Sequence, residues 1–159
     1  MSTLGITGHR AIPAEAMAYV VDGIGGVIKD QTGPLTGVSC LAEGADQLFA
    51  QQIVDAGGAL IGVVPCAGYE ATMDTPEGLA AYQGYLSDAA GLVRLDFAQP
   101  TEEAFWEAGK SVVDRSDVLV AVWDGAGARG LGGTADVVEY AREQGKEVVV
   151  IWPEGVTRA

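Results

Sequence analysis

The chain has 159 residues, 48% of them hydrophobic, and carries 22 acidic but only nine basic residues, which gives a net charge of −13. No apolar run approaches the length of a membrane-spanning helix, and no basic region followed by an apolar stretch opens the chain, so we expect a cytoplasmic protein with no membrane partner. The basic residues are scattered, whereas binding to a nucleic-acid backbone depends on neutralising phosphates, so we do not expect nucleic acid as a partner.

Strand-like and helix-like segments alternate along the whole chain. The predicted strands cover residues 4–7, 37–40, 60–64, 91–95, 118–123 and 147–152. The predicted helices cover residues 13–28, with Pro13 as the first helical residue, 45–56, 76–89 and 135–144, with a further helix that begins at Thr101. Thr75 before Pro76 is a helix-start signal, and residues 66–75 have no clear period and are expected to form a loop. The alternation predicts a single α/β domain over residues 1–159, with three α/β/α layers and a mostly parallel sheet of about six strands.

Two glycine-rich loops directly follow predicted strands. One reads Gly-Leu-Gly-Gly-Thr-Ala-Asp at residues 130–136, and the other reads Thr-Gly-His-Arg at residues 7–10. Glycines let the backbone approach an anion, and the free N–H groups of a first helical turn point at it. Both loops fall at the carboxyl edge of a parallel sheet, where ligands bind at the point of reversed strand order. We therefore predict a phosphate pocket, in which the loops face each other if their strands are neighbours.

The candidate ligand-binding residues lie in these loops and at the start of the second helix. Arg10 can fork onto a phosphate, or lie in solvent at a helix start. His9, the only histidine, can donate to a phosphate or act as an acid or base near neutral pH, or simply pack on the helix start. Thr134 can contact the phosphate or cap its own helix. The predicted set is Gly8, His9, Arg10, Gly44, Arg129, Gly132, Gly133 and Thr134.

Acidic residues in the last helix are the candidate catalytic groups. Asp136 and Glu139 can reach a ribose or exchange protons with it. The alternatives are a first-turn acid favoured by the helix dipole and a residue on the solvated face. At the start of the second helix, Gly44 can let a base or ribose approach, and we expect Asp46 to hold the loop.

The two cysteines, Cys40 and Cys66, each end a predicted strand. Without a Cys-x-x-Cys spacing, we expect them to be small apolar residues in a reduced compartment, the alternative being a redox pair or a metal site. We expect no metal ion and no cofactor. Trp123, at the end of a predicted strand, is expected to pack and not to stack on a base.

Three segments resemble the SLOG superfamily, which contains the Smf/DprA DNA-processing proteins and the Lonely Guy (LOG) phosphoribohydrolases. Residues 5–10, Gly-Ile-Thr-Gly-His-Arg, are similar to the loop after the first strand of that group. Residues 38–65 resemble the Smf pattern of strand, small-residue loop, Gly-x-Asp, helix, Gly-Gly and strand. Residues 116–134 are similar to the strand and glycine loop of the LOG branch. The resemblance implies a Rossmann-like fold with a nucleotide pocket, as in small stand-alone bacterial members.

The same resemblance implies where LOG catalytic residues would lie. LOG enzymes carry a Glu three residues after the threonine of the glycine loop, and that place is Val137 here. Their Arg-Lys pair corresponds to Ala108 and Gly109. A hydrolase would therefore need Asp136 or Glu139 to supply its carboxylate.

The leading hypothesis is the binding of a purine nucleotide or a nucleotide-derived small molecule. One alternative is an enzyme that hydrolyses the N-glycosidic bond of a nucleoside 5′-monophosphate. A second alternative, from the Smf branch, is binding of single-stranded DNA. Exposed apolar helix faces also allow a homodimer.

Overall fold

A computed structural model describes residues 2–127, 131 and 133–157. The strands are β1 (Ser2–Gly8), β2 (Leu35–Ser39), β3 (Ala59–Cys66), β4 (Gly91–Phe97), β5 (Val118–Val122) and β6 (Glu147–Ile151). All neighbouring strands pair in parallel. The predicted α/β fold is confirmed, and the six-stranded sheet is wholly rather than mostly parallel.

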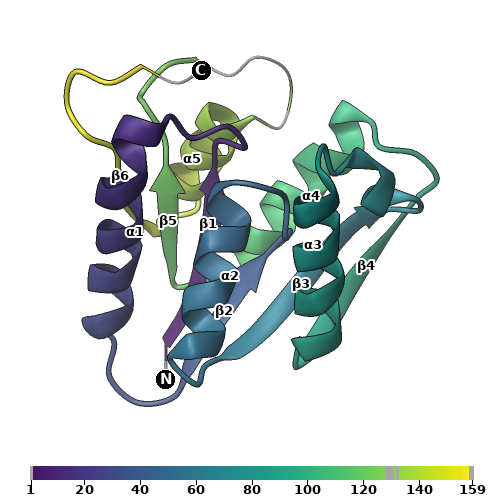
Figure 1. The fold of residues 1–159 in the computed structure, drawn as a ribbon, viewed down its shortest axis with the longest axis horizontal. Coiled ribbons are helices and arrows are strands. Elements are labelled where there is room, and N and C mark those ends of the chain that lie inside the picture. The colour runs from purple at the N-terminus through teal and green to yellow at the C-terminus, as the bar shows by residue number, and fades with distance from the viewer. Residues whose placement is uncertain (1, 128–130, 132, 158–159) are drawn as a thin grey trace.

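Helices cover both faces of this sheet. They are α1 (Ala14–Lys29), α2 (Ala45–Asp55), α3 (Pro76–Asp88), α4 (Glu102–Asp114) and α5 (Thr134–Glu143), with the short 3-10 helix η1 (Tyr69–Thr72). In Figure 1, α1, α2 and α3 lie on the near face, and α4 and α5 lie behind the sheet. Among the described residues, no helix is both long and apolar enough to span a lipid bilayer.

The strand order is β4-β3-β2-β1-β5-β6. From β1 the chain adds β2, β3 and β4 on one side of the sheet and then β5 and β6 on the other, so the order of connection switches between β1 and β5. Gly8 at the end of β1 pairs with Val122 at the end of β5. The two strands that precede the glycine-rich loops are therefore neighbours, as the phosphate-pocket prediction required. Their loops leave the same edge of the sheet at the topological switch point, where a crevice opens in folds of this type.

Local sequence signals explain where the helices begin. The Thr75 hydroxyl accepts a hydrogen bond from the Gly78 N–H, with Pro76 at the first helical position of α3. Thr101 caps α4 in the same way, by accepting from the Ala104 N–H. Side-chain caps of this kind satisfy N–H groups that lack partners within the helix.

The segment predicted as a loop over residues 66–75 contains the helix η1. Its Tyr69 is buried and meets Tyr82 of α3 edge-to-face, with ring centroids 5.5 Å apart. This single turn is stabilised by packing against distant residues, and one turn is too short to show a helical period. For that reason the sequence pattern missed it.

Candidate functional site

A cavity of about 460 Å³ lies at the carboxyl edge of the sheet, between the loop after β1 and the start of α5. Gly8 and Arg10 line it from the first loop, and Gly133 and Thr134 line it from the second. Its volume is in the range of small-molecule sites. The pairing of β1 with β5 thus brings the two predicted loops to one cavity. Arg129 and Gly132, also predicted to bind the ligand, lie outside the described residues.

The loop after β1 is held by backbone hydrogen bonds on two sides. The His9 N–H donates to the Val122 carbonyl, and the Ala45 N–H donates to the His9 carbonyl, both at 3.1 Å. Gly44 makes this approach feasible, because a Cβ atom on it would lie 2.5 Å from the His9 oxygen and 2.3 Å from the Arg10 oxygen. Gly44 lies behind the loop and is not among the described residues that line the cavity. Its observed neighbour is the protein backbone, not the space predicted for a base or ribose.

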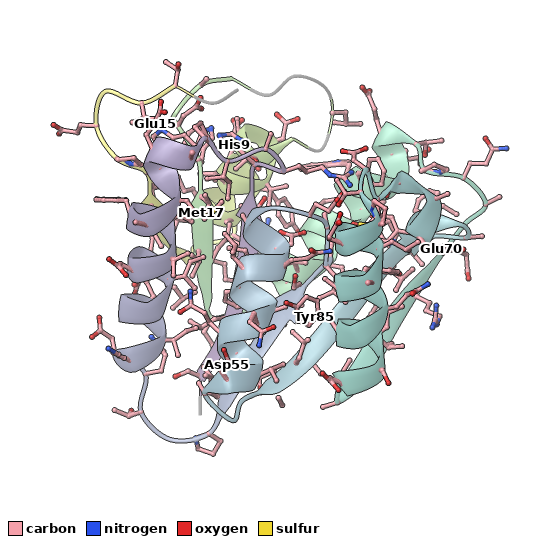
Figure 2. All side chains as sticks on the ribbon, viewed as in Figure 1. His9, Glu15, Met17, Asp55, Glu70 and Tyr85 are labelled. Atoms are coloured by element: carbon pink, nitrogen blue, oxygen red, sulfur yellow. The ribbon has the colours of Figure 1, made fainter. Side chains whose placement is uncertain are left out.

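His9 is 5% exposed and contributes to the cavity wall. Its ring meets Trp152 edge-to-face at 5.3 Å between centroids, and its Nε2 accepts the Asp124 N–H at 3.1 Å. An Nε2 that accepts a hydrogen bond leaves the ring proton on Nδ1. His9 therefore ties together the segments that follow β5 and β6. Figure 2 shows it at the carboxyl edge, opposite Asp55 at the far end of α2.

Arg10 lies at the cavity with its side chain 39% exposed. Its Nη2 donates to the Thr72 carbonyl at 2.8 Å and to Glu43 Oε1 at 3.3 Å. Glu43 also accepts from the Asp74 N–H, the Thr75 N–H and the Thr75 hydroxyl. Burial alone would raise the pKa of Glu43, but these hydrogen bonds and the Arg10 charge outweigh it and lower the pKa. Arg10 is thus held by an ionised partner at the cavity, and its contact with a phosphate stays a prediction.

The start of α5 forms the other side of the cavity mouth. Gly133 is the N-cap residue and Thr134 is the first helical residue, so the predicted alternative that Thr134 caps its helix is wrong. The Gly133 carbonyl accepts the Val137 N–H at 3.2 Å. Because glycine has no side chain, the cap residue itself supplies no hydrogen-bond acceptor to the first-turn N–H groups.

The predicted catalytic acids belong to α5, one wall of the cavity. Neither Asp136 nor Glu139 is among the described residues that line it, and Glu139 faces a separate surface hollow with Trp123 and Arg142. Helix geometry explains this, because successive residues turn by about 100°. Thr134 faces the cavity, and so does Val137 three residues later, whereas Glu139 points to another side. Neither acid thus contributes to the described cavity lining, and a catalytic role for Asp136 or Glu139 stays a prediction.

The wall formed by α4 and α5 is apolar. Phe105, Ala108 and Gly109 of α4 line the cavity together with Val137 of α5. A Cβ atom on Gly109 would lie 2.7 Å from Val137 Cγ2, so the two helices are in close contact there. Ala108, Gly109 and Val137 are the positions to which the LOG resemblance assigned catalytic groups. In this chain they present only hydrocarbon or backbone atoms to the cavity. This wall can hold an apolar ring or sugar face, and it offers no carboxylate or cation.

The carboxylate that does line the cavity is Asp46, for which the sequence predicted only a role in the loop. It lies in the first turn of α2, and its Oδ2 accepts the Ala42 N–H at 3.3 Å. Burial raises the pKa of Asp46 to about 7, against the lowering effects of the Ala42 N–H and of Arg10. Its place just beyond the carboxyl end of β2 was a usable signal, since ligands bind at that edge.

Cys66 is buried, whereas Cys40 is partly buried and lines the cavity. Both are free, and burial raises the pKa of each thiol, with Asp46 adding to the effect at Cys40. A raised pKa keeps a thiol protonated and unreactive at neutral pH. Over the described part of the chain, no group of three or more His, Cys, Asp or Glu side chains gathers in a metal-binding arrangement.

Comparison with solved structures gives clear matches in fold. DNA processing protein A from Streptococcus pneumoniae superposes with a TM-score of 0.68 and 21% identity, covering 94% of this chain and 50% of that one. DNA processing protein A from Helicobacter pylori gives 0.70 and 16%, covering 99% and 68%. The structural-genomics protein TM1055 gives 0.59 and 18%, covering 93% and 72%. The present chain thus spans half the length of the Streptococcus pneumoniae chain.

These matches correct one expectation drawn from charge. The Helicobacter pylori structure is described as showing a single-stranded DNA binding mode, so a chain with this fold does bind nucleic acid. The expectation that nucleic acid is not a partner was wrong. It rested on the net charge of the chain, whereas the phosphates of a nucleic acid contact a local surface.

No family model matches the chain, and no curated protein sequence matches it either. The likeness to the solved structures, at 16–21% identity, lies in the fold. At that level the predicted resemblance is confirmed: the chain shares a Rossmann-like fold with the two DNA processing A proteins and with TM1055.

Proposed function

We propose that this protein binds a nucleotide in the cavity, with the phosphate at the two glycine-containing loops. One observation carries the proposal: the parallel pairing of β1 with β5 brings Gly8, Arg10, Gly133 and Thr134 to a single cavity. Close backbone approach at glycines and the N-terminal end of α5 both favour an anion. Arg10 adds a positive charge at the same place.

Arg10 retains donors for a phosphate. Both of its hydrogen bonds to described residues leave from Nη2, to Glu43 and to Thr72. The Nε–H and Nη1–H groups face no acceptor among those residues and can bond a phosphate in the forked geometry that guanidinium groups favour.

The apolar wall supports binding more than bond cleavage. Phe105, Val112 and Val137 offer a surface for the sugar or base, as in most small-molecule sites. Hydrolysis of an N-glycosidic bond needs a carboxylate beside the sugar, and the acids predicted for that task, Asp136 and Glu139, do not line the cavity. The hydrolase alternative therefore lacks the support of these two residues, and Asp46 is the carboxylate that lines the cavity among the described residues.

A thermal-shift screen of adenine and guanine nucleotides tests the proposal. A ligand at ten times its Kd stabilises the folded state by about 1.4 kcal/mol, which raises the Tm of a chain of this size by about 3–6 °C. We expect such a shift with at least one nucleotide, and at least a tenfold weaker affinity for the Arg10→Ala variant.

Arg115→Ala is the matched control, because it removes the same charge at the end of α4, away from the cavity. Each variant is compared with its own ligand-free Tm. The proposal fails if no nucleotide at millimolar concentration shifts the wild-type Tm, or if both arginine variants lose affinity equally.

A second candidate function is the binding of single-stranded DNA at the same edge. It is favoured by the fold shared with the Helicobacter pylori protein over 99% of this chain. Nucleotide units of a single strand present the same phosphate and base chemistry as a free nucleotide. The two functions therefore predict competition between a nucleotide and an oligonucleotide for Arg10.

Fluorescence anisotropy with a labelled oligothymidylate tests this second function. A site that neutralises two phosphates gives a slope of about −1.4 in log K against log salt, or about sevenfold weaker binding between 50 and 200 mM salt. We expect Arg10→Ala to weaken binding and to flatten this slope, and Arg115→Ala to change neither. Affinity that does not respond to salt would count against contacts with the DNA backbone.

A further inference from the structure

Asp46 lines the cavity from the first turn of α2, whereas Thr134 lines it from the start of α5. The Ala45 N–H bonds the His9 carbonyl, which fixes the first turn of α2 beside the end of β1. The sheet order places β2 and β5 on either side of β1, so the segments that follow them are two strand spacings apart, or about 10 Å. This separation is comparable with the length of a nucleoside monophosphate. A ligand with its phosphate at Thr134 therefore has its polar far end near Asp46.

The carboxyl group of Asp46 has one oxygen engaged and one available. Oδ2 accepts the Ala42 N–H, while Oδ1 receives no hydrogen bond from any residue that the structure describes. The charged or titratable groups that act on it are Cys40 at the end of β2, Tyr69 of η1 and Arg10 of the first loop. Burial raises the pKa of the Cys40 thiol and of the Tyr69 hydroxyl well above their usual values, so both are neutral at pH 7.

Holding the loop does not require an acid at this position. An asparagine oxygen would accept the Ala42 N–H equally well, without the unfavourable burial of a charge. A partly buried carboxyl group that lines a cavity, with a strongly shifted pKa and an available oxygen, is typical of a functional position.

We propose that Asp46 selects the nucleotide, because its Oδ1 accepts a hydrogen bond from a donor on the ligand, either a ribose hydroxyl or the exocyclic amine of the base. The inference rests on the proposed nucleotide binding and deepens it. It makes the preferred ligand a ribonucleotide or an amino-purine nucleotide. A ligand that lacks the donor leaves a buried carboxyl group without its partner, which is a strong basis for rejection.

The test combines ligand analogues with a variant. AMP, 2′-deoxy-AMP, 3′-deoxy-AMP and purine riboside 5′-monophosphate are titrated calorimetrically into the wild type and into Asp46→Asn. The asparagine oxygen can keep the Ala42 N–H and then presents an NH₂ group, a second donor, to the ligand. We expect the wild type to prefer AMP at least tenfold over the analogue that lacks the contacted group, and Asp46→Asn to lose this preference.

The matched control is Asp55→Asn, the same chemical change at the opposite end of α2, where Asp55 bonds Gln51 (Figure 2). It should keep the wild-type preference. If the wild type binds a deoxy analogue at least tenfold more weakly than AMP, Asp46 contacts the missing hydroxyl. If purine riboside 5′-monophosphate is the weakly bound analogue, Asp46 contacts the amine. If AMP binds and Asp46→Asn retains the same preference, or the wild type shows none, this inference is overturned while nucleotide binding stands. If the wild type binds none of the four, this inference is overturned, whereas the proposed function fails only if the thermal-shift screen gives no shift with any nucleotide.

Discussion

The Asp46→Asn variant is expected to be more stable than the wild type at pH 8, by up to about 4 kcal/mol, and nearly equal to it at pH 4. In the folded protein the pKa of Asp46 is raised by burial to about 7, whereas an unfolded chain has a value of about 3.9. Between these values the folded state binds more protons than the unfolded state, so wild-type stability falls as pH rises. Asparagine has no proton to lose, and its advantage should therefore grow from pH 4 to pH 7 and then level off.

Urea denaturation of both proteins at several pH values measures this difference, because other acids titrate equally in both. The Asp55→Asn variant, altered at an exposed aspartate, should show no such pH-dependent gap. A gap of the same size at pH 4 and pH 8 would show that ionisation of Asp46 is not its cause. The expected gain in stability also ensures that any loss of nucleotide affinity in Asp46→Asn is not due to unfolding.

Gly44→Ala is expected to destabilise the protein by about 3 kcal/mol or more. The residue has φ 86° and ψ −130°, a backbone conformation that side chains disfavour. Its new methyl group would lie 2.3 Å from the Arg10 oxygen and 2.5 Å from the His9 oxygen. These atoms are backbone and cannot turn aside, so the loop after β1 must move and the Ala45–His9 hydrogen bond must weaken.

The control for this variant is Gly57→Ala, after the end of α2. Gly57 also has a positive φ, of 76°, but a Cβ atom there would meet nothing within 4 Å. It should therefore cost only the backbone strain, about 1–2 kcal/mol. Urea midpoints of the two variants, at unchanged m-values, separate strain from overlap. Equal losses would contradict the steric role that we assign to Gly44.

Much of the fold could be predicted because each strand is a local apolar run and most helices carry a local period. The six predicted strands match the observed ones to within two residues at every end, and Thr75 marks the start of α3 as expected. The pocket prediction required β1 and β5 to be neighbours in the sheet, but the sequence could not show that they are. Strand order depends on how helices from distant segments pack together, and no single segment records it.

The site was harder to predict, because side-chain direction and distant partners decide it. The acids of α5 were chosen for their closeness in sequence to the glycine loop, whereas the phase of the helix turns Val137 and not Glu139 toward the cavity. Arg10 is held by Glu43, 33 residues away, and no local pattern indicates that contact. Asp46 was visible as a helix-start acid, but its burial follows only from the assembled cavity.

The attachment of His9 on several sides has a consequence for the thermodynamics of the proposed nucleotide binding. Its N–H, its carbonyl and its ring are bonded to residues from three other segments: Val122, Ala45, and Asp124 with Trp152. The conformational entropy of this loop is therefore lost during folding and not during ligand capture. Preorganisation of this kind removes an ordering cost that a flexible phosphate loop would impose on its ligand. In a loop that is rigid before the ligand arrives, the interaction energy is not offset by an ordering cost. Differences in contacts between similar small molecules then appear directly as differences in affinity.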